Sequence, residues 1–220
     1  GASAGGPTTL AHVFELLKTH LKGVKPGQLL ASMLVVQHMP AAFTAPMAAR
    51  FAELSGLPVR VAETGDTLEK GSCLVAPGGR NLFLNDSRKI QLSGGGHTPG
   101  EYPKIDLALV TAADLFGSHL CGIILTGMGR DGTEGLTHAY KLRAATFVQE
   151  PSTCVVDGMP TAALQAKAAE VRLTPAQIAE VVAHILLHAR VPSLEGLAKH
   201  RIDESSGDRR AVDSDSSQSP

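Results

Sequence analysis

The sequence has no tryptophan, few aromatic residues, three cysteines and almost no net charge. Its 220 residues carry a formal charge of −1, which argues against a nucleic-acid binder, because such proteins present a basic face to the phosphates. Cys73, Cys121 and Cys154 are widely spaced and match neither a disulfide framework nor a CxxC metal site, so we expect no metal and a reducing compartment. No apolar run reaches about 18 residues, so we expect no membrane insertion.

What the chain does contain is 43% hydrophobic residues, enough for a buried core of aliphatic side chains. Helical and strand-like stretches alternate, which predicts an α/β fold with a doubly wound, mostly parallel sheet. Short alternating stretches between 59 and 93 predict an antiparallel β-hairpin excursion. Other predicted elements lie at 8–22, 29–37, 43–58, 105–117, 121–127, 131–143, 144–150, 158–167 and 174–190. We expect one folded domain over 1–203 and a disordered polar tail over 204–220.

The chain begins with a glycine-rich stretch, GASAGGP, that fits the pattern G-x-S-x-G. In a nucleophile elbow such glycines allow a sharp strand-to-helix turn, which exposes the serine hydroxyl, here that of Ser3. Five small residues are weak evidence, so an unreactive strand-to-helix turn remains an alternative. A phosphate loop is a second alternative, although GGPTT lacks the lysine that a Walker loop requires.

Two further loops carry the partners that a serine nucleophile needs. His38 follows the predicted strand 29–37, and an imidazole can take a serine proton near pH 7; the alternative is a histidine that only ends the strand. Asp131 lies in the loop TGMGRDG, where a carboxylate can orient an imidazole and the Met128 amide can stabilise an oxyanion. The alternative role of Asp131, and likewise of Asp106, is to cap the adjacent helix.

Ser3, His38 and Asp131 each follow a strand-like run or the place of one. Because active residues of parallel sheets gather at the carboxyl ends of the strands, we expect the three to meet at one edge of the sheet. Their order along the chain, Ser–His–Asp, differs from the Ser–Asp–His order of α/β-hydrolases. The sequence therefore predicts a serine hydrolase on another fold.

Five motifs make the sequence similar to the catalytic domain of chemotaxis protein-glutamate methylesterases, the CheB family. They are GASAGGP, VVQHMPAAFTAPMAARF, VAPGGRNLFL, GIILTGMGRDG and CVVDGMPTAAL, all in the family's order. The resemblance implies a cytoplasmic carboxylic-ester hydrolase that removes glutamate γ-methyl esters from chemoreceptor helices in chemotactic adaptation. Some members also deamidate receptor glutamines, and none of this chemistry needs a cofactor.

The resemblance also assigns roles to particular residues. It makes Ser3 the nucleophile, His38 the general base and Asp131 the carboxylate that orients His38. The backbone amides of Met128 and Ala4 would form the oxyanion hole. In this scheme Ser3 attacks the ester carbonyl, methanol leaves, and water activated by His38 frees the glutamate.

The chain departs from the family at several points. The family has a strand before GAS, which we expect upstream of Gly1. It usually also has a receiver domain, so a receiver domain or a receptor methyltransferase is a candidate partner. Ala4 stands where the family often has a hydroxyl residue, and Tyr102 stands where it commonly has an arginine that contacts substrate. The alternative function is therefore a catalytically weak CheB-like domain that binds a receptor or a methyltransferase.

Overall fold

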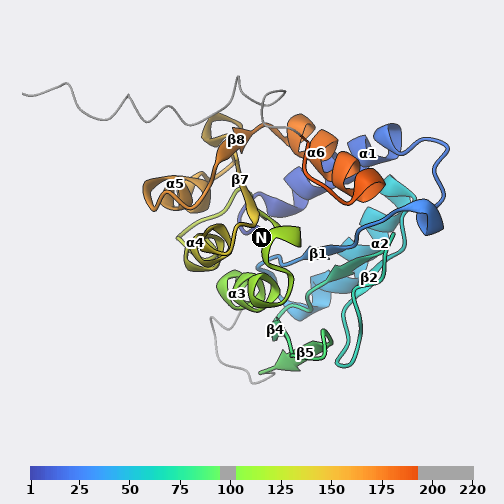
Figure 1. Cartoon of the computed structure of the whole chain (residues 1–220), viewed down its shortest axis with the longest axis horizontal. Coiled ribbons are helices and arrows are strands. Elements are labelled where there is room, and N and C mark those ends of the chain that lie inside the picture. Colours follow the sequence, from blue (N-terminus) through green and yellow to red (C-terminus); the bar gives the residue numbers. More distant parts are fainter. Residues whose placement is uncertain (95–102, 193–220) are drawn as a thin grey trace, which may run out of the picture.

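The computed structural model describes residues 1–94 and 103–192, with strands through the middle and helices on both sides (Figure 1). The helices are α1 Gly6–His20, α2 Thr44–Ser55, α3 Ile105–Phe116, α4 Thr133–Lys141, α5 Gly158–Gln165 and α6 Pro175–His188. The strands are β1 Met33–Val35, β2 Val59–Val61, β3 Cys73–Val75, β4 Asn81–Leu84, β5 Ile90–Ser93, β6 Cys121–Ile124, β7 Ala145–Gln149 and β8 Val171–Leu173. Tyr102 and the predicted tail over 204–220 lie outside the described residues.

The main sheet is parallel and has two three-stranded halves, ordered β2-β3-β1 and β6-β7-β8. The opening residues, 1–3, lie between these halves. Ala2 forms a parallel bridge with Gln37, just beyond β1. On the other side, the amide of Leu125, just beyond β6, donates to the carbonyl of Gly1 at 2.8 Å. Residues 1–3 therefore join the two halves and leave the sheet at its carboxyl edge.

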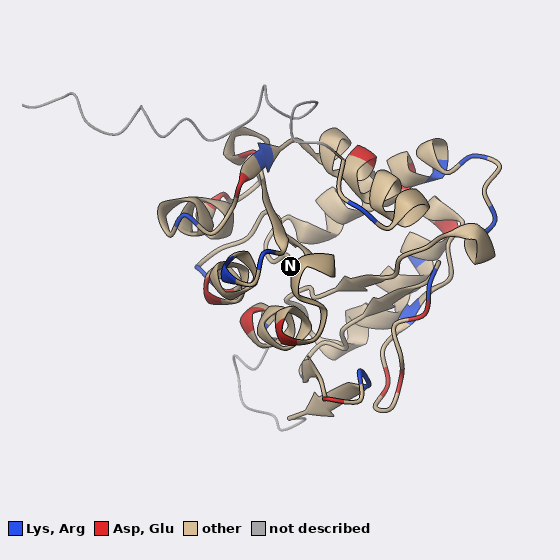
Figure 2. Cartoon of the chain, in the orientation of Figure 1, with Lys and Arg blue, Asp and Glu red and all other residues tan. Residues whose placement is uncertain are grey.

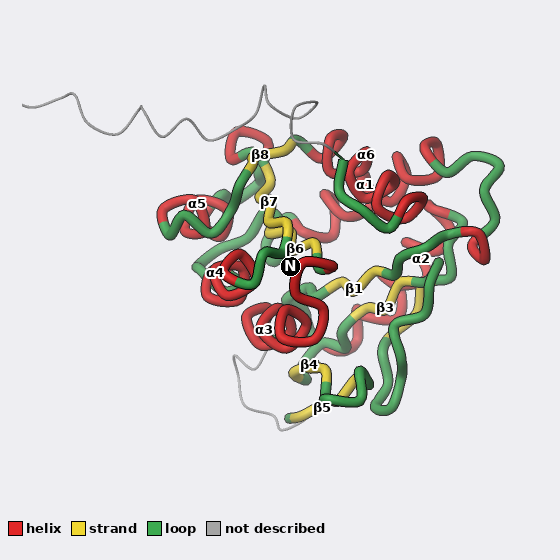
Figure 3. Tube along the Cα trace, in the orientation of Figure 1, coloured by secondary structure: helices red, strands yellow, loops and turns green. Residues whose placement is uncertain are grey.

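Helices cover both faces of this sheet, as Figure 3 shows in red on either side of the yellow strands. Helices α1, α2 and α6 pack together on one face, and α3 and α4 pack together on the other. In the first layer the rings of Phe14 and Phe51 stack with centroids 4.5 Å apart, an arrangement that stabilises by about 0.5–1.5 kcal/mol beyond area burial. This architecture confirms the predicted α/β fold class.

The predicted antiparallel excursion over 59–93 was only partly right. Strands β4 and β5 do form an antiparallel hairpin, with Asn81 opposite Ser93. Strands β2 and β3, however, belong to the main parallel sheet. The three residues of β3 are all buried, as expected for a strand covered on both faces. A three-residue strand is too short to reveal its pairing direction, and for the same reason β8 was not predicted.

The beginning of α6 agrees with the sequence prediction. Thr174 is the N-cap of α6 as expected, because its hydroxyl accepts a hydrogen bond from the amide of Gln177. In return the Gln177 side chain accepts one from the amide of Thr174.

Charged residues of both signs are interspersed over the described elements (Figure 2). No helix in residues 1–94 and 103–192 is long and apolar enough to cross a bilayer.

Candidate active site

Ser3 lies on the turn between the middle of the sheet and α1. Its amide donates to the carbonyl of Thr126 at 3.0 Å, and the Thr126 hydroxyl donates to the carbonyl of Ala4 at 2.9 Å. Gly5 then takes a φ of +80°, a left-handed conformation that glycine adopts without the penalty other residues incur. The sequence prediction of a sharp strand-to-helix turn is confirmed. The turn places Ser3 before the N-terminus of α1, where the helix dipole favours negative charge.

His38 connects Ser3 with Asp131. Its Nδ1 lies 3.2 Å from the Ser3 Oγ, and its Nε2 lies 2.7 Å from the Asp131 Oδ2. A carboxylate accepts only, so the neutral ring that fits carries its proton on Nε2 and turns the Nδ1 lone pair toward the serine hydroxyl. The side chains of His38 and Asp131 are 16% and 25% exposed. The structure thus brings the three predicted residues together in a site that stays partly exposed to solvent.

Asp131 is held by α3 as well as by His38. The amides of Ile105 and Asp106, in the first turn of α3, donate to its carboxylate at 2.8 and 3.0 Å. Burial alone would raise the pKa of Asp131, but these hydrogen bonds and that of His38 outweigh it and lower the pKa below its usual range. The alternative in which Asp131 caps the following helix is wrong, because Gly132, with no side-chain cap, is the N-cap of α4.

Asp106 is the reciprocal of Asp131. Its carboxylate accepts from the amide of Gly135 in the first turn of α4 at 2.7 Å, while Asp131 accepts from the first turn of α3. Asp131, which precedes α4, therefore caps α3. Asp106, in the first turn of α3, caps α4. Burial raises the pKa of Asp106 to about 6, against the opposing effect of the Gly135 hydrogen bond and with a contribution from the nearby charge of Asp131.

The raised pKa of Asp106 predicts a pH-dependent stability. The folded state holds this proton more tightly than the unfolded chain, so the stability that Asp106 contributes is lost as the pH rises from about 4 to about 6. Asp106→Asn keeps a cap for Gly135 and removes the ionisation. Between pH 4 and 7 we expect the unfolding free energy of the wild type, measured by urea denaturation, to decrease more than that of Asp106→Asn. Asp86→Asn on an exposed turn is the control, and identical profiles for Asp106→Asn and the wild type would contradict the assignment.

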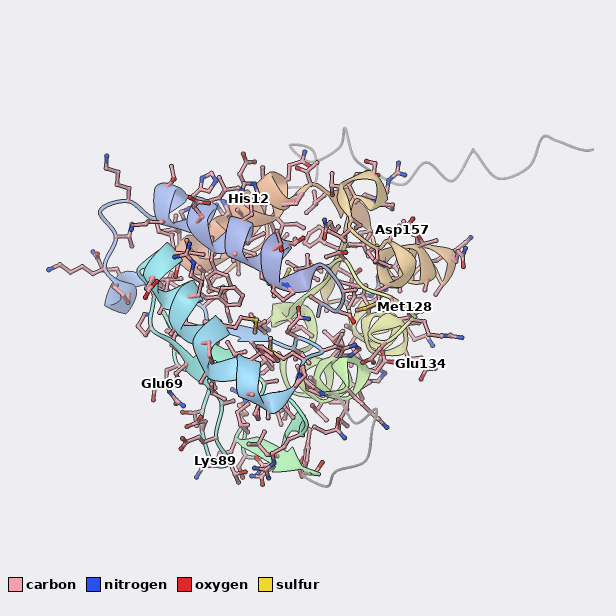
Figure 4. The ribbon with its side chains drawn as sticks, turned by 180° about the vertical axis from the view of Figure 1, so that it is seen from behind. His12, Glu69, Lys89, Met128, Glu134 and Asp157 are labelled. Carbon is pink, nitrogen blue, oxygen red and sulfur yellow. The ribbon has the colours of Figure 1, made fainter. Side chains whose placement is uncertain are left out.

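The candidate oxyanion donors are the amides of Ala4 and Met128. Among the described residues neither amide donates a hydrogen bond to the protein, so both remain available to a ligand. The residue before Met128 is fixed by two hydrogen bonds, because the Gly127 amide donates to the carbonyl of Val156 and the Gly127 carbonyl accepts from the amide of Met159. The Met128 side chain is 77% exposed. Figure 4 labels it between Asp157 and Glu134, the residues at the beginnings of α5 and α4.

Gly127 is required where this loop passes Ser3. A Cβ at position 127 would lie 2.7 Å from the Cβ of Ser3 and 3.1 Å from its backbone nitrogen. We expect Gly127→Ala to lower esterase activity by roughly ten- to a hundredfold, because the nucleophile must shift, and to destabilise the fold by about 1–3 kcal/mol. Initial rates and urea denaturation measure the two effects. Gly27→Ala, where a Cβ meets open space, is the matched control, and an equally small effect at both positions would contradict the close approach.

Sequence reasoning missed the polar residues that hold these loops. Thr126, just beyond β6, also accepts a hydrogen bond from the amide of Val156 through its hydroxyl. Gln149, at the end of β7, accepts from the amide of Thr126 at 2.9 Å, and Gln37 has a similar place beyond β1. Their common signal is a polar residue at the carboxyl end of an apolar strand. Residues 1–94 and 103–192 contain no group of three or more His, Cys, Asp or Glu side chains arranged to hold a metal.

The family model described as CheB methylesterase matches residues 1–182 of this chain. The chain belongs to the CheB methylesterase family. The crystal structure of the Thermotoga maritima CheB methylesterase catalytic domain superposes with a TM-score of 0.73 at 31% identity, covering 84% of this chain and 95% of that domain.

Curated relatives of this CheB-family chain are named protein-glutamate methylesterase/protein-glutamine glutaminase. The relative from Moorella thermoacetica is 38% identical over 193 residues, which are 86% of this chain and 44% of the relative. That from Symbiobacterium thermophilum is 37% identical over 182 residues, which are 83% of this chain and 48% of the relative. The chain therefore spans about half the length of the curated relatives it matches.

Proposed function

We propose that this domain is a protein-glutamate methylesterase in which Ser3 is the nucleophile. The observation that carries the proposal is the hydrogen-bonded chain from the Ser3 Oγ through His38 to Asp131. Relatives at 37–38% identity bear the name of this activity. A free serine hydroxyl is a weak nucleophile, and an adjacent base oriented by a carboxylate is the arrangement that activates it.

Acylation begins when the Ser3 Oγ attacks the γ-carbonyl of a glutamate methyl ester. The proton moves to the Nδ1 of His38, and Asp131 stabilises the resulting imidazolium through Nε2. The developing oxyanion accepts hydrogen bonds from the amides of Ala4 and Met128. Methanol leaves with the proton from His38, and the glutamyl group stays on Ser3 as an ester.

Deacylation repeats these steps with water. His38 takes a proton from water, the hydroxide attacks the acyl-enzyme, and Ser3 leaves with the proton that His38 returns. The products are a glutamic acid side chain and the original enzyme, and the acid releases its proton to solvent near neutral pH, so each turnover adds a negative charge to the substrate protein. The same attack on a glutamine side chain would release ammonia, which is the glutaminase activity in the names of the relatives.

The substrate that we propose is the methylated cytoplasmic helix of a chemoreceptor, and the location is the cytoplasm. A receiver domain or a receptor methyltransferase is the proposed regulatory partner. The competing function, a weakly catalytic module that binds a receptor or a methyltransferase, has less support, because the Ser3 Oγ and the His38 Nδ1 lie within hydrogen-bonding distance of each other.

The proposal is tested with a chemoreceptor cytoplasmic fragment that a receptor methyltransferase has esterified with labelled methyl groups. The protein should release labelled methanol in proportion to enzyme and time, and the fragment should gain free glutamates by peptide mass analysis. Binding of the fragment without methanol release would contradict the esterase and favour the binding module. Ammonia release from an unmodified fragment measures the glutaminase activity separately.

A further inference from the structure

Gln37 lies between the nucleophile and the general base. It follows β1, pairs with Ala2 in the sheet and is 1% exposed. Its side-chain nitrogen donates to the backbone carbonyl of Ser3 at 2.9 Å and to that of His38 at 2.9 Å. One amide group therefore holds the backbone of both reacting residues.

We propose that Gln37 is a positioning residue, whose side-chain amide fixes the Ser3 turn against the His38 loop in the geometry that proton transfer requires. The inference rests on the proposed esterase function and deepens it. Gln37 does not face the substrate, so its effect on the reaction passes entirely through the two residues whose carbonyls it binds.

The chemistry of the contact selects an amide. Two carbonyl oxygens accept only, so the group between them needs two donors, which the –NH2 of glutamine supplies. An ionised carboxylate of the same shape would oppose both oxygens, and an apolar side chain would leave the contact unmade. Because both partners are acceptors, the nitrogen and not the oxygen of Gln37 must face them.

The oxygen end of the Gln37 side chain shows that the fold keeps this contact although part of the side chain is unpaired. The Oε1 of Gln37 is buried and has no hydrogen-bond partner among the described residues, and a buried polar atom left unpaired destabilises the fold. A Cβ at Gly6 would overlap that oxygen, so the glycine leaves room for the side chain. Because one end of this buried side chain is unpaired, a role in placing Ser3 and His38 explains Gln37 better than a contribution to stability does.

The distance that this contact controls is the 3.2 Å between the Ser3 Oγ and the His38 Nδ1. The main-chain connection between the two loops runs through Ala2, whose carbonyl accepts from the His38 amide at 3.0 Å. Gln37 adds two hydrogen bonds directly at the reacting residues. Because a misplacement of about 1 Å can lower a rate by about 10²-fold, loss of this brace should reduce kcat more than substrate binding.

The first test is Gln37→Met, which keeps the length of the side chain and removes its donors. We expect kcat for methanol release from the esterified receptor fragment to fall roughly ten- to a hundredfold, with KM within about twofold of the wild type. The control is Ile178→Ala in α6, a buried residue at 2% exposure on the helix that packs against α1. It should lose stability and keep kcat per folded molecule.

The second test is Gln37→Glu, because a protonated glutamic acid regains one donor. Its kcat relative to the wild type at the same pH should rise as the pH falls from 8 to 5.5, measured on samples shown to be folded by circular dichroism. Wild-type kcat in folded Gln37→Met, or a near-wild-type and pH-independent ratio for Gln37→Glu, would overturn the positioning role. Ser3→Ala separates the two proposals: an active Ser3→Ala contradicts the esterase mechanism, whereas an inactive Ser3→Ala with a fully active Gln37→Met contradicts this inference alone.

Discussion

Replacement of Ser3 by alanine is expected to lower methanol release by about 10⁶-fold, the scale on which the loss of a triad member acts. The substitution removes the hydroxyl oxygen that forms the acyl bond, and a water molecule in its place lacks the orientation that the turn supplies. What remains is the weak catalysis by the oxyanion donors and substrate binding. Release of labelled methanol from the esterified receptor fragment measures the effect over this range.

The fold should not change in this variant. The amide of Ser3 keeps its hydrogen bond to Thr126, and its carbonyl keeps the hydrogen bond from Gly6. We therefore expect the melting temperature and the affinity for the receptor fragment to stay close to those of the wild type. Turnover within about tenfold of the wild type would show that Ser3 is not the nucleophile, since triad loss acts on a far larger scale.

Asp131→Asn is expected to lower kcat by about 10⁴-fold, as the corresponding change does in serine proteases. The Asp131 carboxylate accepts from the Nε2 of His38 and from the amides of Ile105 and Asp106. An asparagine has one accepting oxygen, so its –NH2 must oppose either the amide of Asp106, at the place of Oδ1, or both His38 and the amide of Ile105, at the place of Oδ2. If it faces His38 it selects the tautomer with the proton on Nδ1, which cannot accept the Ser3 proton.

The chain offers a matched control for this prediction. Asp114 and His138 form a second carboxylate–imidazole pair with the same 2.7 Å separation, on the exposed surfaces of α3 and α4. Asp114→Asn should leave kcat unchanged, because that pair lies outside the site. Equal activities for Asp131→Asn and Asp114→Asn would contradict the role of Asp131. Nitrogen-15 nuclear magnetic resonance of the His38 ring would report the tautomer directly.

The candidate site could be predicted from the sequence because its chemistry lies at the ends of strands. Ser3, His38 and Asp131 each follow an apolar run or the place of one, and parallel strands bring such ends to one edge. The capping pattern could not be predicted, because Asp131 and Asp106 each cap a helix distant in sequence. The role of Gln37 was equally hidden, since its carbonyl partners on Ser3 and His38 become neighbours only when the sheet assembles.

The fold shows the same division between local and long-range information. The helices and the hairpin of β4 and β5 have local patterns that the sequence displays. Strands β2, β3 and β8 have three residues each. The sequence predicts β2 and β3 as strands but in an antiparallel arrangement, and it does not predict β8, because so short a run does not show its pairing direction. Their places in the sheet depend on the pairing of β2 with β3, of β3 with β1 and of β8 with β7, which no local pattern encodes.

The central claim is that hydrolysis passes through an ester on Ser3, and partition of that ester between water and hydroxylamine tests it most directly. An acyl-enzyme transfers its glutamyl group to either nucleophile after methanol has left. The account predicts that the wild-type enzyme converts part of the methyl ester to the γ-hydroxamate, in proportion to hydroxylamine, and that Ser3→Ala makes none above the uncatalysed reaction. Methanol release by the wild type without hydroxamate, or hydroxamate formation undiminished in Ser3→Ala, would contradict it.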